Sequence, residues 1–255
     1  MACSTPSTPP TGRRSPAGYD DGVGLAELSE RAQNYLKVIW GLQEWSDAAV
    51  TPTLIAERAG VRLSTASGAV GKLADQGLVE HAPYGAVTLT RQGHRYALEM
   101  VRRHRLIETF LVQVLGYRWD QVHDEAERLE HAVSDFMVER LDAHLGRPTR
   151  DPHGDPIPDA DGHVPTPAAR LLADVEPGHT VRVERISDAD PELLRYFAEH
   201  HITVGVQLEV QPGPPYSESL HIRPAGGAAP LSLGGAATRS VWVSAAEEGP
   251  APSSQ

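Results

Sequence analysis

The chain has 255 residues and a formal net charge of −11, and hydrophobic residues make up 40% of it. This length allows two compact domains, and the single cysteine, Cys3, excludes both a disulfide framework and a cysteine-rich zinc site. The sequence has neither a secretory signal at its start nor an apolar run of about 18 residues. We therefore expect a cytoplasmic protein that does not enter a membrane.

Charge is divided unevenly along the chain. Residues 51–107 carry eight basic and four acidic residues, a net charge of +4, whereas residues 119–161 carry four basic and twelve acidic residues, a net charge of −8. A basic segment can meet phosphates, and an acidic segment can meet cations.

The first third of the chain predicts a disordered start followed by short helices and a hairpin. Residues 1–24 are rich in Ser, Thr, Pro and Gly, which is typical of disorder. Apolar periodicity, caps and turn residues then predict helices over 29–45, 52–59 and 64–77, and strands over 78–80 and 86–90. This order of helix, glycine-containing turn, helix and hairpin is that of a winged helix-turn-helix unit.

In such a unit the second helix of the pair enters the major groove, and its first residues reach the base edges. Small polar side chains allow close approach, and basic ones can bind phosphates. The predicted DNA contacts are Arg62, Ser64, Thr65, Ser67, Gly68, Lys72 and, in the wing, Tyr84. The same helical geometry also occurs in protein-interaction modules.

Two long helices are predicted next, over 91–115 and 119–145. On the first, His104 and Glu108 lie four residues apart and share a face. The second carries a polar stripe of His123, Glu127, Glu130 and His131. Imidazole and carboxylate together suit divalent first-row metals, so the two helices predict a metal site.

An apolar stripe lies beside the polar one on the second helix and predicts a dimer interface. Its members are Val122, Ala126, Leu129, Val133 and Phe136. Residues 147–167, with six prolines and four aspartates, predict an irregular arm in which His153 and His163 have no role. Strands over 179–186, 207–211, 220–223 and 241–243, with a helix over 191–200, predict a small β-barrel.

Three runs of sequence closely resemble the diphtheria-toxin-repressor family of metal-dependent regulators. They are HDEAERLEHAVSD at 123–135, RHRL at 103–106 and DPHGDPIP at 151–158. The resemblance covers residues 28–245 and is nearest to the manganese-responsive branch. It implies a mainly α fold whose parts are a winged helix-turn-helix domain (28–91), a helical dimerisation and metal domain (92–146), a Pro-rich arm (147–170) and an SH3-like barrel (171–245), between disordered tails (1–27 and 246–255).

The resemblance also implies two metal sites. Carried over position by position, the primary site corresponds to Asn34, Glu127, Glu130 and His131, and the ancillary site to His104, Glu108 and His123. Asp190 matches the carboxylate that the barrel adds in some relatives, whereas Leu193 stands at the next ligand position and cannot bind. Asn34 departs from the family, where Asp or Met is usual.

The implied function is that of a homodimeric repressor, not an enzyme, that binds double-stranded palindromic operator DNA and controls metal-uptake genes. Glu127 stands where iron-responsive relatives carry a thiol, so hard ligands favour Mn(II) as the activating metal, with Fe(II) as the alternative. Two other functions are considered. A metallohydrolase would need an open metal position in a cleft and a general base, and a winged-helix regulator could respond to an organic ligand.

Overall fold

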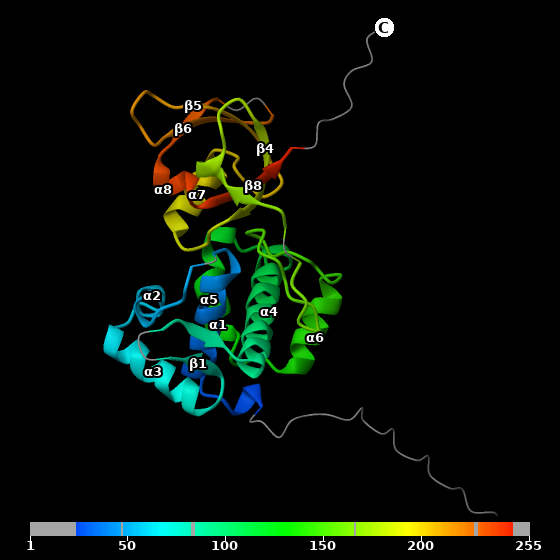
Figure 1. The fold of residues 1–255 in the computed structure, drawn as a ribbon. Helices are drawn as coiled ribbons and strands as arrows, with labels where there is room; N and C mark the ends of the chain where they lie inside the picture. The colour runs from blue at the N-terminus through cyan, green and yellow to red at the C-terminus, as the bar shows by residue number, and fades with distance from the viewer. Residues whose placement is uncertain (1–23, 47, 83–84, 166, 227–228, 247–255) are drawn as a thin grey trace, which may run out of the picture.

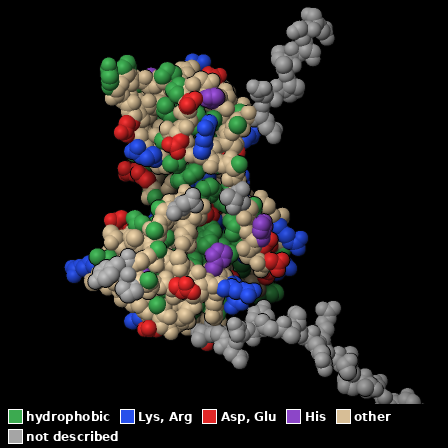
Figure 2. Space-filling model, viewed as in Figure 1, with side chains coloured by type: hydrophobic (Ala, Val, Ile, Leu, Met, Phe, Trp, Pro, Cys, Tyr) green, Lys and Arg blue, Asp and Glu red, His purple; other side chains and the backbone are tan. Residues whose placement is uncertain are grey.

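The computed structural model describes residues 24–46, 48–82, 85–165, 167–226 and 229–246. The first two-thirds of the chain form a helical part, and the last third forms a part built on a β-sheet that lies at one end of it (Figure 1). A narrow waist separates the two parts in the space-filling view (Figure 2). No helix of the described ranges is both long enough and apolar enough to cross a membrane.

The helical part begins with the predicted three helices and hairpin. Their observed bounds are α1 (Glu30–Glu44), α2 (Pro52–Arg58), α3 (Leu63–Asp75), β1 (Val79–His81) and β2 (Val87–Leu89). Local chemistry explains the helix starts, because the side chains of Ser29 and Thr51 accept hydrogen bonds from the first turns of α1 and α2. The predicted helices and hairpin are confirmed, each bound within two residues.

The predicted N-terminal tail ends earlier than expected. Most of residues 1–27 lie outside the described residues, but Leu25–Glu27 forms a 3-10 turn, η1. Leu25 is buried in the core of the helical part, because its side chain packs with the apolar face of α1.

Helix α4 (Arg91–Gln113) is the long predicted helix, and it packs along α1. Thr90 caps its start. Gly93 lies so close to β1 that a Cβ atom there would be 1.9 Å from the carbonyl oxygen of Leu78. Only glycine allows this approach, which fixes the hairpin against the helix that carries His104 and Glu108.

The second predicted long helix, over 119–145, is wrong as a single element. The structure has a 3-10 turn, η2 (Trp119–Gln121), then α5 (His123–Leu129) and α6 (Asp135–His144). The chain turns after α5 and starts again at Ser134, whose side chain accepts a hydrogen bond from the backbone N–H of Met137. The apolar stripe is therefore divided: Val122, Ala126 and Val133 are buried inside the protomer.

The Pro-rich arm is irregular, as predicted, but it is packed into the protein. Arg105 donates to the carbonyl of Pro156 (2.5 Å) and Arg102 to that of Pro158 (2.9 Å). The backbone N–H of Ile186 donates to the carbonyl of His153 (2.9 Å). Gly154, at φ +91°, lies so close to the sheet that a Cβ atom would be 2.1 Å from the carbonyl oxygen of Glu184.

The C-terminal part is built on one antiparallel sheet with the strand order β3-β8-β4-β5-β6-β7. Burial alternates along β4, so one face of the sheet covers a separate apolar core. The elements are β3 (Arg170–Leu171), η3 (Leu172–Asp174), β4 (Thr180–Ile186), α7 (Pro191–Glu199), β5 (Gln207–Pro212), β6 (Leu220–Pro224), β7 (Leu231–Leu233), α8 (Gly235–Thr238) and β8 (Val241–Ala245).

The predicted closed barrel is wrong, because the sheet is open. Its edge strands β3 and β7 are two and three residues long and do not pair with each other. The prediction of a mainly α fold therefore holds only for the helical part. The two parts meet where Arg185 of β4 lies over the rings of Trp45 and Trp242, 4.8 and 4.2 Å from their centroids, and pairs with Asp155 of the arm.

Candidate metal centre

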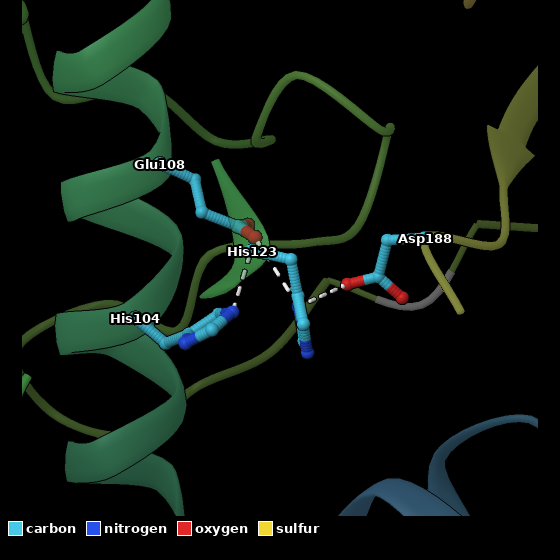
Figure 3. A group of neighbouring side chains, drawn as sticks. All are labelled: His104, Glu108, His123 and Asp188. Atoms are coloured by element: carbon cyan, nitrogen blue, oxygen red, sulfur yellow. Dashed lines mark hydrogen bonds and ion pairs between the residues drawn. The ribbon is translucent and has the colours of Figure 1, made fainter. Parts of the chain in front are cut away.

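Glu108 lies at the centre of a group of buried and half-buried metal-type ligands drawn from three segments (Figure 3). His104 and Glu108 come from α4, His123 begins α5, and Asp188 follows β4. Glu108 Oε1 lies 3.1 Å from His104 Nε2 and 3.5 Å from His123 Nδ1, which is itself 2.8 Å from Asp188 Oδ2. These four residues place donor atoms within 4.8 Å of one another.

The carboxylate that the sheet part contributes is Asp188, not the expected Asp190. Asp190 is exposed at the N-cap of α7, where its side chain accepts hydrogen bonds from the backbone N–H groups of Glu192 and Leu193. That capping role directs Asp190 away from His123. Asp188, two residues earlier, faces the centre.

A second group shares Glu108 and includes a histidine that the sequence analysis left without a role. Glu108, Asp151 and His153 also place donor atoms within 4.8 Å of one another. His153 is fully buried, with Nδ1 3.8 Å from Glu108 Oε2 and Nε2 2.8 Å from the carbonyl oxygen of Trp119. No helical spacing links residue 153 to residue 108; the packed arm alone brings them together.

The predicted primary set is not gathered in the same way. Asn34 is exposed on α1, and Glu127 is exposed on α5. Glu130 is fully buried, with Oε1 2.6 Å from the ammonium nitrogen of Lys37 on α1 and Oε2 2.6 Å from Nδ1 of His104 on α4. Lys37 Nζ is also 3.5 Å from Glu127 Oε1 and 3.4 Å from His104 Nδ1. Lys37 thus takes the place between these ligands, which the sequence analysis did not predict.

His131, the last member of that set, is oriented by Gln33. The Gln33 amide donates to the carbonyls of Leu25 and Leu28, so its oxygen faces His131 Nδ1 at 2.7 Å. Because that oxygen only accepts, Nδ1 carries the hydrogen. Nε2 of His131 is buried, has no hydrogen-bond partner among the residues that the structure describes, and lies 3.6 Å from Glu130 Oε1.

The predicted DNA contacts gather on one exposed face of α3 and its N-cap. Arg62, Ser64, Thr65, Ser67, Gly68 and Lys72 are all exposed, whereas Ala66, Val70 and Leu73 point into the core. Tyr84 lies outside the described residues. A Cβ atom on Gly68 would meet nothing within 4 Å, so the fold itself does not require glycine there.

Comparison with known proteins gives matches along most of the chain. Residues 27–87 match the iron dependent repressor N-terminal DNA binding domain, residues 90–159 the iron dependent repressor metal binding and dimerisation domain, and residues 170–244 the FeoA domain. The diphtheria toxin repressor of Corynebacterium efficiens is 30% identical over 200 residues, which are 73% of this chain and 85% of that protein. The chain belongs to the iron-dependent repressor family.

Relatives in this iron-dependent repressor family include proteins described by two different metals. The iron-dependent repressor IdeR of Mycobacterium tuberculosis is 38% identical over 136 residues, 52% of this chain; the match spans only 58% of that relative's length. A solved manganese-dependent transcriptional repressor in complex with manganese is 55% identical, with a TM-score of 0.80, covering 84% of this chain and 100% of that one. The manganese regulator SloR is 32% identical, with a TM-score of 0.71, over 84% of this chain and 98% of that one.

Electrostatics hold two buried or half-buried carboxylates of this centre, Glu108 and Asp188, ionised against burial. Burial opposes ionisation of Glu108, but the charge of His104 and hydrogen bonds from the surrounding imidazoles outweigh it, so the pKa of Glu108 lies well below its usual range. The pKa of Asp188 is lowered as well, because its contact with His123 outweighs burial. Buried ionised carboxylates beside imidazoles are a donor set that fits a divalent cation.

The imidazoles show the reverse shift. Burial opposes their protonation, but Asp188 and Glu108 raise the pKa of His123 to about 10, and Glu108 with Asp151 raises that of His153 to about 10. Without metal, the rings of His123 and His153 are therefore both protonated on both nitrogens, as imidazolium, at neutral pH. A metal ion must displace these protons to reach the nitrogens.

We expect opposite pH trends with and without metal. The raised pKa values stabilise the metal-free fold fully below the ordinary value of about 6.5, and this contribution is lost as pH rises toward about 10. Manganese binding strengthens over the same range because fewer protons compete. The increase in Tm caused by Mn(II) should therefore become larger as the pH rises from about 6.5 to about 8.5. The measurement is made under argon at a fixed concentration of free metal. An increase in Tm that does not change with pH would contradict these histidines as ligands.

Proposed function

We propose that the protein is a homodimeric, metal-dependent repressor of the cytoplasm that binds palindromic operator DNA and controls metal-uptake genes. The observation that carries the proposal is the Glu108 centre, which joins α4, α5 and the sheet part through His104, His123 and Asp188. An ion held by all three segments would fix their relative positions. It would thereby select the DNA-competent arrangement, and DNA in turn would tighten metal binding. No residue is given a catalytic role.

Mn(II) is the proposed activator and Fe(II) the alternative. The candidate ligands offer carboxylate oxygens and imidazole nitrogens, and Cys3 lies far from them in the sequence. Hard ligands without thiolate favour manganese over softer metals. The manganese-dependent structural relative supports this choice, and the iron-dependent relatives keep Fe(II) as the second candidate.

The proposal is tested with DNA fragments that the protein itself selects from a random pool in the presence of Mn(II). Fluorescence anisotropy of these fragments should show tight binding with Mn(II), loss of binding on adding a chelator, and recovery on adding back the metal. An anaerobic titration with Fe(II) decides between the two ions. Binding that is indifferent to chelator would refute metal dependence and favour a regulator with another ligand.

Gly68 provides a separate test of the DNA face. A glycine inside a helix costs about 0.5–1 kcal/mol relative to alanine, and open space surrounds this one. We expect Gly68→Leu to raise the Tm of the protein but to weaken operator binding by about tenfold or more, because a side chain would hold the DNA away from α3 (about 1.4 kcal/mol). Gly41→Leu on α1, also in open space within a helix, is the matched control and should leave DNA affinity unchanged. Equal DNA affinity of Gly68→Leu and wild type would remove α3 from the interface.

A further inference from the structure

Arg185 lies between two tryptophan rings that come from different parts of the molecule. Trp45 directly follows α1 in the helical part, and Trp242 lies in β8 of the sheet part. Cζ of Arg185 is 4.8 Å from the centroid of the Trp45 ring and 4.2 Å from that of the Trp242 ring. The two rings also contact each other, with centroids 5.7 Å apart. Arg185 is 8% exposed, and a cation over indole rings is held more strongly where water is excluded.

The charge of Arg185 is matched by Asp155 of the packed arm. Its Nε pairs with Asp155 Oδ1, and the same oxygen lies 3.5 Å from Nη2 of Arg105 on α4. Arg105 in turn lies 2.6 Å from Glu44, the last residue of α1. Arg185 is therefore joined to the helical part by two routes, through the ring of Trp45 and through the carboxylate of Asp155.

A β-bulge gives Arg185 this position. The register of β4 against β8 shifts between Val183 and Arg185, which leaves one extra residue on β4. Side chains normally alternate between the two faces of a strand, but Arg185 and Ile186 are both buried. Bulges redirect side chains in this way and are frequent beside functional sites.

The chain runs directly from Arg185 to the candidate metal centre. Asp188 follows three residues later, and its Oδ2 lies 2.8 Å from His123 Nδ1. The backbone N–H groups of the two intervening residues donate to the arm at 2.9 Å and to the segment just before β8 at 2.8 Å. Because these two residues are fixed, the position of Arg185 determines that of Asp188.

We propose that Arg185 is a positioning residue for the metal centre and acts through Asp188. Its contacts with the two tryptophans and with Asp155 hold the sheet part against the end of α1. Asp188 is then already in place when an ion arrives, so binding needs no ordering of the sheet part. Arginine suits this role because its planar guanidinium can stack on rings while it pairs with a carboxylate. The inference rests on the proposed function, since it requires a divalent ion beside Asp188.

The test is the affinity of the full-length protein for Mn(II) in the absence of DNA, measured by isothermal titration calorimetry under argon. Arg185→Met keeps an unbranched apolar side chain but removes the planar charge. Arg182→Met is the matched control, because Arg182 is an exposed arginine of the same strand whose guanidinium donates to the carbonyl of Gly205. Trp242→Leu is the second variant, since it removes one of the two rings and leaves the charge in place. Thermal unfolding verifies the fold of each variant.

We expect Arg185→Met to weaken Mn(II) binding by about tenfold. Trp242→Leu should weaken it by a smaller factor, and Arg182→Met should bind like wild type. The decisive comparison uses Asp188→Asn, which still offers the imidazoles and Glu108 to the ion. If Arg185 acts through Asp188, Arg185→Met should cause little further loss of affinity in the Asp188→Asn protein.

A folded Arg185→Met protein with the wild-type affinity for Mn(II) overturns the positioning role. An equal loss of affinity with and without Asp188 overturns it as well, because Arg185 would then act on the fold in general. A wild type that binds no Mn(II) overturns the proposed function, and this inference with it.

Discussion

Glu108→Gln is expected to raise the Mn(II) concentration needed for half-maximal operator binding by about 100-fold, equivalent to about 2.7 kcal/mol. Glu108 is 1% exposed and belongs to both ligand groups, so its charge serves every cation placed at the centre. A neutral amide removes that charge and also places an N–H group toward the imidazoles or the cation. The measurement is fluorescence anisotropy of labelled operator DNA at controlled free Mn(II).

Glu99→Gln is the matched control, because Glu99 is a half-buried carboxylate on the same helix, outside both ligand groups. The Mn(II) concentration that Glu99→Gln needs for half-maximal operator binding should equal that of wild type. Removing Glu108 also leaves buried imidazolium groups without their partner, which can cost about 3–5 kcal/mol, so the fold of the variant is checked by thermal unfolding. A folded Glu108→Gln protein with an unchanged manganese requirement would show that the effector ion binds elsewhere.

Phe136→Glu is expected to raise the dimer dissociation constant by at least 100-fold, about 2.7 kcal/mol. The division of the apolar stripe leaves Phe136 76% exposed and its neighbour Met137 46% exposed at the start of α6, with Leu129 37% exposed at the end of α5. Burial of an aromatic side chain in an interface contributes about 1.5–3 kcal/mol, and a buried unpaired carboxylate adds a desolvation cost. Sedimentation velocity at micromolar protein measures the change.

Tyr216→Glu is the control for this experiment, since it also replaces an exposed aromatic residue with a charge, but in the C-terminal part. It should remain dimeric. Phe136→Glu should also lose operator affinity, because one protomer makes only half of the DNA contacts. Persistence of a full dimer in Phe136→Glu would place the interface on another surface.

The residues that sequence reasoning found are those linked by local spacing. His104 and Glu108 share a helical face by their separation of four, and α4 is regular enough to keep that relation. His123 was found in the same way, but as part of a helix that the structure breaks. The N-cap Ser134 was hidden within a continuous apolar period, so periodicity alone ran across the turn between α5 and α6.

The missed residues depend on contacts between distant segments. His153 reaches Glu108 only because the arm folds back against β4. No spacing of residues in the sequence predicts this contact. The resemblance to the family selected Asp190, whereas in the structure Asp188 lies beside His123 and Asp190 caps α7. The open sheet was missed because the lengths of its edge strands, not its pattern, prevent closure.

Lys37 gives the metal-free protein a cation of its own. Its ammonium holds α1 against Glu130 before any ion arrives. A divalent ion that bound Glu130 would have to displace this ammonium. The metal concentration needed for a response would then depend on the difference between the affinities of Glu130 for the ion and for Lys37. Lys37 would then influence the metal concentration at which the protein responds without itself being a metal ligand.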